Sequence, residues 1–413
     1  MLIDNMKKMN GIKMLKYTNK PLLILSIVFA VAGALCILSA SSISSSLRYG
    51  YDTPYMFFLR QLLFIVVGLI ATGIIICSIP TKRYGFLSSV ALIVMIIWII
   101  ATVFVDKVLD LGVNAVAIDL GFFTFQPAEV LKILMIVFLG NVYSKIATTT
   151  NEKVRKWWIG ISIFVALTCS GMILLAGDFG SALIMAALFA LMLLCTPSKV
   201  KYLKIFKIII AICAISGVLF LKFGYLILPD EWLENSYRWG RFNYTQPCDR
   251  YEDNSGYQVC NGFIAMDNGG LTGLGPGGSI QKYLYLPESH TDFIFPIIIE
   301  EFGLISGAII FIFYIVIIIL ILKVAIKCYE LENQIICYGI ATYIMLHIFV
   351  NLGGALGIIP LTGVPLPFLS YGGSFCICLF ASLAIVQRIN SENEYTRRLK
   401  EFKNKKAQNN RQK

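Results

Sequence analysis

Long apolar runs separated by short charged segments constrain this chain more than any other feature. Ten stretches are long and apolar enough to cross a bilayer as helices. A helix satisfies its own backbone hydrogen bonds, and about 20 apolar residues cover the ~30 Å hydrocarbon core. Hydrophobic residues make up 57% of the chain and charged residues 14%, which is far from a soluble domain. The sequence therefore predicts an all-α, polytopic membrane protein with spans at 22–43, 57–79, 84–105, 127–147, 157–175, 179–196, 205–228, 293–322, 334–358 and 366–387.

Lysine and arginine residues mark every second loop, and their positions predict the orientation. These residues accumulate on the cytoplasmic side of short loops. Segment 1–20 and the tail 390–413 are both basic, so we expect both termini on the cytoplasmic side of the bacterial cell membrane. The net charge of +11 follows from this bias and does not indicate nucleic-acid binding. The basic loops carry Lys82 and Arg83, Lys145 to Lys156, Lys199 to Lys207, and Lys323 and Lys327.

The same pattern predicts the domain organisation. Residues 21–389 are expected to form one membrane domain, whose first helix is retained because no small-residue cleavage site follows it. A large loop at 229–291 joins spans seven and eight on the extracellular side, and the polar tail 390–413 is expected to be disordered. Nine of the eleven cysteines lie in or beside spans. A disulfide between the other two, Cys248 and Cys260, is left open by their spacing.

The extracellular loop combines aromatic rings, basic side chains and a glycine run. Its rings suit the membrane interface or stacking on a sugar. Arg238, Arg241 and Lys282 are candidate donors to phosphate oxygens. The glycine run at 269–279 permits close backbone approach and offers N–H groups to an anion. It lacks the lysine–serine ending of a nucleotide-binding loop, so nucleotide binding is excluded.

Polar residues also interrupt the apolar spans. Arg60 lies in the second span, and Glu129 and Lys132 lie in the fourth. The i,i+3 spacing of the latter two predicts mutual neutralisation on one helix face. Glu300 follows Asp292 by eight residues, which places it about 12 Å further along a helix. Two acids on one helix favour polar surroundings over lipid contact.

The segment from Leu286 to Phe295 concentrates ionisable groups where the extracellular loop re-enters the membrane. It contains Glu288, His290 and Asp292. Ionisable groups are costly at membrane depth, so their presence at its edge is a functional-site hypothesis. Asp292 is also placed to cap the helix that follows, and the two roles are compatible.

Five motifs in the same order make the chain resemble the SEDS family, the shape, elongation, division and sporulation proteins. The resemblance runs from the first span to the last. The extracellular loop and glycine run are most similar to those of division-type members. The motifs are Phe125 to Glu129, Gly177 to Ala182, Gly256 to Gln258, Leu286 to Phe295, and Pro360 to Ser374.

The resemblance implies ten helices and an enzyme, a peptidoglycan glycosyltransferase that polymerises lipid II into glycan strands on the outer face of the membrane. It also implies a class B penicillin-binding protein as transpeptidase partner, with other membrane proteins of division or elongation. The family's essential aspartate is Asp292 here. A carboxylate suits a base that takes the proton from the acceptor sugar hydroxyl. The pyrophosphate leaving group calls for cations or a divalent metal, Mg or Mn, and no organic cofactor is implied.

Two departures from the family pattern keep alternatives open. Val116–Ala117 replace an Arg-Trp pair and Ala176–Gly177 replace Gln-Pro. Because the first change removes a cation, one alternative is that the protein is a non-catalytic scaffold for the penicillin-binding partner. The other is a lipid II flippase, for which the polar groups within the spans, Glu129, Lys132 and Glu300, matter more than Asp292. The candidate substrate-binding residues are Arg60, Glu129, Lys132, Arg238, Arg241, Lys282, Glu288, His290 and Ser370.

Overall fold

The structure, a computed structural model, is mostly helical in the part of the chain that it describes. That part comprises residues 11–51, 53–107, 116–119, 124–196, 201–223, 226, 244, 246–250 and 254–411. Two short strands, β1 (Ile118–Asp119) and β2 (Thr124–Phe125), pair antiparallel. The α-helices are α2 (Lys20–Leu47), α3 (Met56–Ser78), α4 (Tyr84–Lys107), α5 (Pro127–Thr148), α6 (Glu152–Ala176), α7 (Phe179–Cys195), α8 (Lys201–Phe223), α10 (Asn254–Gly269), α11 (Ile294–Ile326), α12 (Leu331–Ala355) and α13 (Gly373–Arg411). The 3-10 helices are η1 (Gly11–Tyr17), η2 (Thr81–Arg83) and η5 (Pro247–Arg250).

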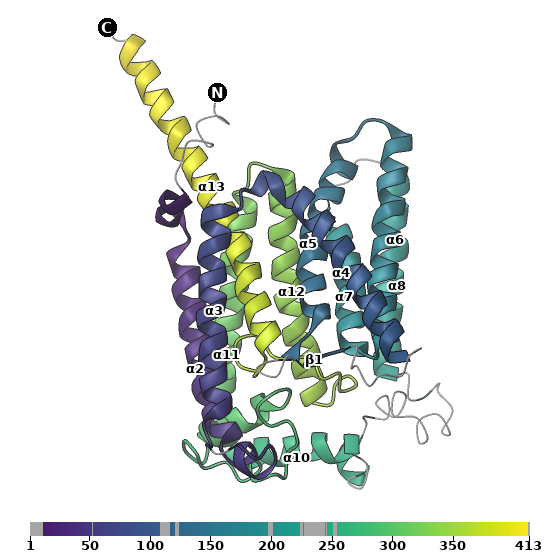
Figure 1. Ribbon diagram of the computed structural model, residues 1–413, viewed down its shortest axis with the longest axis vertical. Coiled ribbons are helices and arrows are strands. Elements are labelled where there is room, and N and C mark those ends of the chain that lie inside the picture. Colours follow the sequence, from purple (N-terminus) through teal and green to yellow (C-terminus); the bar gives the residue numbers. More distant parts are fainter. Residues whose placement is uncertain are drawn as a thin grey trace.

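Each of the ten predicted spans coincides with a helix. Eight of these helices are long and apolar enough to cross a membrane, while α7 and residues 207–220 of α8 are shorter apolar segments. The bundle helices run along the long axis of the molecule (Figure 1). The predicted fold class, an all-α polytopic membrane protein, is confirmed.

The core of the bundle lies at α5, α12 and α13. Of the most apolar part of each, 67% is buried in α5, 72% in α12 and 83% in α13. The corresponding buried share is 17% for the span that contains α4 and 22% for α6, which therefore present apolar side chains outward. Polar side chains on the central helices are shielded from lipid, which is where ionisable groups are tolerated within a membrane.

The last span begins later than the sequence predicts. Residues 361–372 are not helical, and α13 begins at Gly373 rather than at Leu366. Pro365 and Pro367 carry no backbone N–H and disfavour helical geometry in the residues before them, so an apolar run alone did not suffice for a helix.

The prediction of a disordered tail is wrong, because α13 continues as one helix to Arg411. Charged residues one turn apart stabilise the extension: Arg388 contacts Glu392 at 2.7 Å, and Arg398 contacts Glu394 at 3.1 Å. The low hydrophobicity of this segment concealed a helix whose charged pairs are buried where it meets the bundle, as with Arg388 and Glu392, and more exposed further along, as with Arg398 and Glu394.

The two ends of the chain lie at the same end of the bundle. Asn390 Nδ2 donates to Tyr17 O at 2.8 Å, and the Tyr17 ring packs against that of Tyr395. Figure 1 shows η1 and the projecting end of α13 together, with α10 at the opposite end. This arrangement agrees with an even number of membrane crossings.

Helix α11 is broken at Gly303, where φ is 77° and ψ is 172°. The break frees carbonyl groups, and the glycine run satisfies them. Leu274 N donates to Glu300 O and Gly275 N donates to Glu301 O, both at 2.9 Å. The sequence suggests that N–H groups of the glycine run could bind an anion. At Leu274 and Gly275 they instead donate to carbonyls of the interrupted helix.

A buried ion pair fastens the loop that carries the glycine run to the broken helix. Lys282 Nζ lies 3.0 Å from Glu301 Oε1, and both side chains are at most 5% exposed. Ser39 Oγ donates to Glu301 at 2.6 Å, and Lys282 also donates to Ser39 Oγ at 3.2 Å and to Gly277 O at 2.8 Å. A charged pair removed from water stabilises a fold only with such additional hydrogen bonds.

The neighbouring acid, Glu300, is fully buried and is bound by the same loop. Its carboxylate accepts from Asn268 Nδ2 at 3.1 Å, from Gln281 N at 3.2 Å and from Ser279 Oγ. The polar surroundings that the sequence predicts for this acid are supplied by loop residues packed against it.

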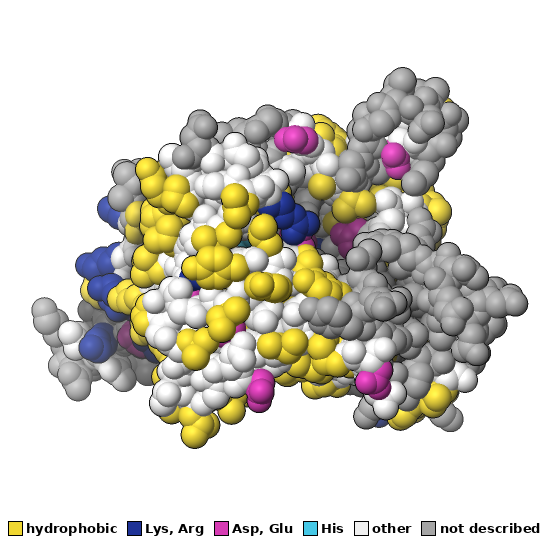
Figure 2. Space-filling model, turned by 90° about the horizontal axis from the view of Figure 1, so that it is seen from below, with side chains coloured by type: hydrophobic (Ala, Val, Ile, Leu, Met, Phe, Trp, Pro, Cys, Tyr) yellow, Lys and Arg dark blue, Asp and Glu magenta, His cyan; other side chains and the backbone are white. Residues whose placement is uncertain are grey.

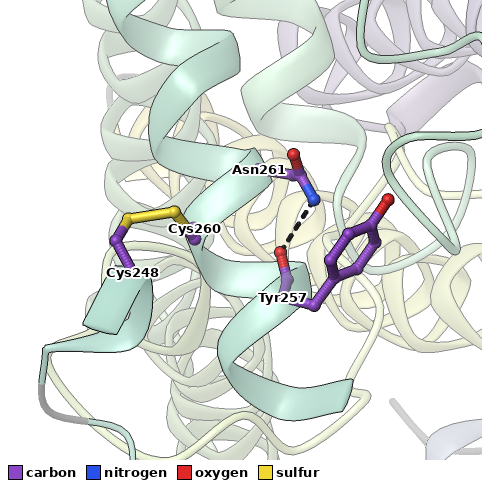
Figure 3. The surroundings of a disulfide bond; sticks show 4 residues. All are labelled: Cys248, Tyr257, Cys260 and Asn261. Atoms are coloured by element: carbon purple, nitrogen blue, oxygen red, sulfur yellow. Dashed lines mark hydrogen bonds between the residues drawn. A yellow bond between two sulfur atoms is a disulfide. The ribbon is translucent and has the colours of Figure 1, made fainter. Parts of the chain in front are cut away.

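A disulfide joins Cys248 in η5 to Cys260 in α10, which answers the question that their spacing left open (Figure 3). It closes a loop of 12 residues and ties a short 3-10 helix to the helix that leads into the glycine run. Beside it, Asn261 Nδ2 donates to Tyr257 O at 3.0 Å within α10.

Replacing Lys282 by Met is expected to destabilise the protein by about 3–5 kcal/mol, because Glu301 is left as a buried, unpaired charge. The double variant Lys282→Met with Glu301→Met is expected to lose less, since both charges are removed together. Unfolding in detergent measures the difference. The matched control is Lys156→Met, which breaks the exposed pair with Glu152 and should leave stability unchanged. A double variant less stable than the single one would contradict the expectation.

Candidate active site

Two non-helical segments meet at the end of the bundle that is opposite the termini. We call residues 286–293 the acidic loop and residues 360–372 the proline loop. Figure 2 shows this end, where hydrophobic side chains are spread over the surface and a basic patch lies among them. The exposed hydrophobic residues include Leu271, Leu274, Ile280, Tyr283 and Tyr285.

The acidic loop turns around the carbonyl of Glu288. This residue has a φ of 55°, and the N–H groups of Thr291 and Phe293 both donate to its oxygen at 3.2 Å. Thr291 Oγ1 donates to the Glu288 carboxylate at 2.9 Å. The N-cap residue of α11 is Phe293, which makes no side-chain capping bond. Asp292 lies in the acidic loop, directly before this N-cap residue.

Three donors from outside the acidic loop bind three successive carbonyls within it. Two of them come from the proline loop and one comes from α12. Each bound carbonyl restricts the backbone of the loop, and the last of the three belongs to Asp292, the predicted catalytic acid. The bonds run from Tyr371 N to His290 O (2.9 Å), from Ser370 Oγ to Thr291 O (2.7 Å) and from Asn351 Nδ2 to Asp292 O (3.0 Å).

Asp292 is half-buried, and its carboxylate faces the proline loop at Gly363. A Cβ at this glycine would lie 3.2 Å from Asp292 Oδ2, and the φ of Gly363 is +73°. A side chain there would be strained and would crowd the carboxylate. The exposed glycine leaves one side of Asp292 without a side-chain cover from this segment.

His290 is buried in an aromatic cage on the other side of the acidic loop. Its ring centroid lies 4.4 Å from that of Phe57, 5.7 Å from Tyr371 and 5.9 Å from Tyr49. Burial lowers the pKa of His290 from its ordinary value of 6.5 to about 4, partly opposed by the nearby Glu288 carboxylate. The imidazole is therefore neutral at neutral pH, and among the described residues its Nδ1 has no hydrogen-bond partner.

Two arginines lie near this cage. Arg60 Nη1 donates to Tyr51 OH at 3.0 Å, and its guanidinium lies 5.0 Å from the centre of that ring. Arg48 lies 3.6 Å from the Glu288 carboxylate, with nearly half of its side chain exposed. The charge of Arg60 also lowers the pKa of Tyr371, although burial raises it more. Positive charge thus lies beside the acidic loop and the start of α13.

The other predicted cations have different surroundings. Lys282 is committed to the buried pair with Glu301 described above. Arg238 and Arg241 lie outside the described residues.

A second polar cluster lies inside the bundle and contains Glu129 and Lys132. Their predicted pairing is confirmed, with Lys132 Nζ 2.7 Å from Glu129 Oε1 and the lysine fully buried. Lys132 also lies 3.2 Å from His347 Nε2 and 3.4 Å from Ser181 Oγ. Tyr343 OH donates to Glu129 Oε2 at 3.4 Å. The paired lysine is therefore enclosed by α7 and α12.

This cluster is connected to the acidic loop through one face of α12. His347 Nδ1 lies 3.3 Å from Pro365 O, and Asn351 Nδ2 donates to Val364 O at 2.8 Å. His347 and Asn351 are four residues apart, so they lie on the same side of the helix.

Sequence reasoning placed Ser370 in the site but did not assign Asn351, Tyr371 or Gly363 a role there. A polar residue near the end of an apolar span was the available signal for Asn351. Its two acceptor carbonyls come from segments far apart in the chain, which a pattern of residue types does not connect. No group of three or more His, Cys, Asp or Glu side chains that could hold a metal ion is found in the part of the chain that the structure describes.

The sequence matches a family model over residues 20–395, FTSW_RODA_SPOVE, described as cell cycle protein. It is 32% identical over 390 residues to the probable peptidoglycan glycosyltransferase FtsW of Bacillus subtilis, covering 93% of each chain. It is 36% identical over 303 residues to the FtsW of the same description from Lactococcus lactis, covering 69% of this chain and 70% of that one. Stage V sporulation protein E of Bacillus subtilis is 27% identical, over 91% of this chain and 97% of that one.

Two solved structures share the fold. One is described as structural coordination of polymerization and crosslinking by a peptidoglycan synthase complex, with a TM-score of 0.68 and 20% identity over 91% of this chain and 98% of that chain. The other is the rod shape determining protein RodA of Thermus thermophilus, with a TM-score of 0.57 and 19% identity over 88% of this chain and 95% of that chain. At these identities the likeness shows the arrangement of the helices.

Replacing His290 by Phe is expected to remove one source of acid sensitivity. The folded-state pKa of about 4 lies below the ordinary 6.5, so the neutral ring contributes its full stability above pH 6.5. That contribution is lost as the pH falls toward 4, because the unfolded chain then binds the extra proton. Thermal midpoints in detergent should therefore fall less steeply in this window for the variant. The control Tyr49→Phe keeps the histidine and should follow the wild-type curve, whereas equal slopes for all three proteins would refute the expectation.

Proposed function

The chain belongs to the family of cell cycle proteins represented by FtsW, RodA and SpoVE, and from this premise we propose that it is a peptidoglycan glycosyltransferase that polymerises lipid II into glycan strands. The observation that carries the site assignment is the fixed position of Asp292. Its own carbonyl and those of the two residues before it are bound, and its carboxylate faces a glycine. A base must be held in one geometry to act on a reacting hydroxyl.

Asp292 is the general base of this proposal. It accepts the proton of the acceptor sugar hydroxyl as that oxygen attacks the anomeric carbon of the donor sugar. The bond from that carbon to the lipid pyrophosphate breaks, and the pyrophosphate leaves with the electron pair. A half-buried carboxylate that faces an exposed glycine meets the first requirement of such a base, which is reach.

Arg60 is the cation that we assign to the developing charge of the leaving group, because it lies near the acidic loop and its guanidinium can bind phosphate oxygens bidentately. Arg238 and Arg241 stay candidates from the sequence. Lys282 has its own carboxylate partner, so we assign it to holding the loop. A divalent cation, Mg or Mn, stays a prediction, tested by adding a chelator to the polymerisation reaction.

We further propose that both termini are cytoplasmic and that the loops around Asp292 face outward. The basic residues at the terminal end support this orientation. The fold shared with a peptidoglycan synthase complex supports a class B penicillin-binding protein as partner. Polymerised strands then meet the transpeptidase on the same side of the membrane.

The flippase alternative rests on the buried cluster of Glu129, Lys132 and His347. These side chains bind one another inside the bundle rather than reaching the acidic loop directly. Transport requires this cluster to exchange partners during the cycle, whereas polymerisation requires the carboxylate of Asp292. The two activities therefore depend on different residues.

Replacing Asp292 by Asn is expected to abolish polymer formation, by at least about 100-fold, because a general base contributes about 10²–10⁴ in rate. The measurement is glycan synthesis from purified lipid II in the presence of the penicillin-binding partner with its transpeptidase blocked. Thermal unfolding and co-purification with the partner should be unchanged, since the amide keeps the shape of the side chain. Asp267→Asn, an exposed acid in α10, is the matched control and should keep full activity.

Each other outcome favours a different function. Normal polymer from Asp292→Asn would show that another group is the base. No polymer from the wild type, despite a stable complex with the partner, would favour the scaffold. Lipid II flipping that survives Asp292→Asn but is lost in Lys132→Met would favour the transporter.

Labelling of cysteines in intact cells tests the orientation. Cys248, the exposed partner of the disulfide with Cys260, is expected to react with a membrane-impermeant maleimide only after that bond is reduced. Asn404→Cys, placed in the exposed extension of α13, is expected to react only after the cells are opened. The reverse pattern would place the acidic loop in the cytoplasm and would contradict the proposed site.

A further inference from the structure

Asn351 is the side chain outside the two loops that binds both of them. It lies near the end of α12, and it is 4% exposed. Its Nδ2 donates to Asp292 O at 3.0 Å in the acidic loop and to Val364 O at 2.8 Å in the proline loop. Both hydrogens of the amide are therefore used, one on each loop.

The helix that carries Asn351 is a rigid reference for the two loops. α12 is among the most buried helices of the bundle, with 72% of its most apolar part buried. The neighbouring turn of the same face is fixed as well, because His347 contacts Lys132 and Pro365 O. The loops are held against a helix that cannot move without disturbing the bundle core.

The other end of the Asn351 amide is not satisfied. Among the described residues, no donor reaches Asn351 Oδ1, although the atom is buried. A buried acceptor without a partner is unfavourable for folding. Asparagine at this position is thus not optimal for the stability of the fold. Its contribution is a pair of hydrogen-bond donors in a fixed geometry.

We propose that Asn351 is a positioning residue for Asp292 in glycan polymerisation. Its amide fixes the distance between the main chain of the acidic loop and the proline loop, and so between the Asp292 carboxylate and the open side at Gly363. It acts through Asp292 and touches neither substrate. This inference rests on the proposed function, since it assigns to Asn351 the placement of that reaction's base.

The test compares Asn351→Ala with wild type in polymerisation from purified lipid II, again with the blocked penicillin-binding partner. We expect kcat to fall about 10- to 100-fold with KM changed less than about threefold, because a misplaced base slows the chemical step without weakening substrate binding. Hydrogen exchange should rise in residues 286–293 but not in residues 331–345 of α12. Asn333→Ala is the matched control, a buried asparagine of the same helix whose amide donates to Glu330 at 3.2 Å.

A double-mutant cycle separates positioning from a general loss of structure. If Asn351 acts through Asp292, Asn351→Ala should reduce the residual rate of Asp292→Asn by less than twofold, because the base is already absent. An equal further loss in both backgrounds, or a rise of KM with kcat unchanged, would overturn the proposal. If Asn351→Ala fails to fold, Asn351→Ser, which keeps one donor, is read in the same way. A wild type that makes no polymer would refute the proposed function, whereas active wild type and active Asn351→Ala would refute this inference alone.

Discussion

Non-helical backbone at the edge of a bilayer must find hydrogen-bond partners within the protein, and the arrangement of this end of the molecule follows from that requirement. The acidic loop leads into α11, and the proline loop lies between α12 and α13. Donors of the proline loop bind carbonyls of the acidic loop. Ser370 binds both Leu366 N and Thr291 O, at 2.7 Å each. The same solution recurs at Gly303, where the glycine run satisfies the broken helix. Paired non-helical segments thus account for the arrangement of this end of the molecule.

Buried charges make these arrangements specific. The pair of Lys282 and Glu301 exists only when the extracellular loop lies against α11, and the pair of Glu129 and Lys132 only within α5. Hydrophobic contact alone would allow the loop to pack on the bundle in several positions. A buried lysine is stable only in the position that brings its carboxylate partner within contact distance. The apolar surface packs the bundle together, and the charged groups select how the loop is placed upon it.

The spans could be predicted because the length of an apolar run is a local property of the sequence. The pairing of Glu129 with Lys132 could be predicted because residues three apart on a helix lie on the same face. The position of Asp292 at the loop was also predictable from the run of ionisable groups. The extension of α13 was not, since its stability comes from pairs such as Arg388 with Glu392 rather than from apolar residues. Nor was the role of Asn351, because its two acceptors belong to segments distant in sequence, and only the packed structure brings them together.

The loss of the family's Arg-Trp pair at Val116–Ala117 is easier to understand beside the arginines that remain. Charge stabilisation depends on where a cation lies when the leaving group departs, not on which element carries it. Arg60 approaches the acidic loop from α3, and its contact with Tyr51 holds the guanidinium over an aromatic ring. A cation fixed in this way needs little reorganisation during reaction. The acidic loop is held at three successive carbonyls, the last of which belongs to Asp292, and the Asp292 carboxylate faces Gly363. Together with Arg60 at the neighbouring aromatic cage, this arrangement suits a fixed base and a cation for the leaving group.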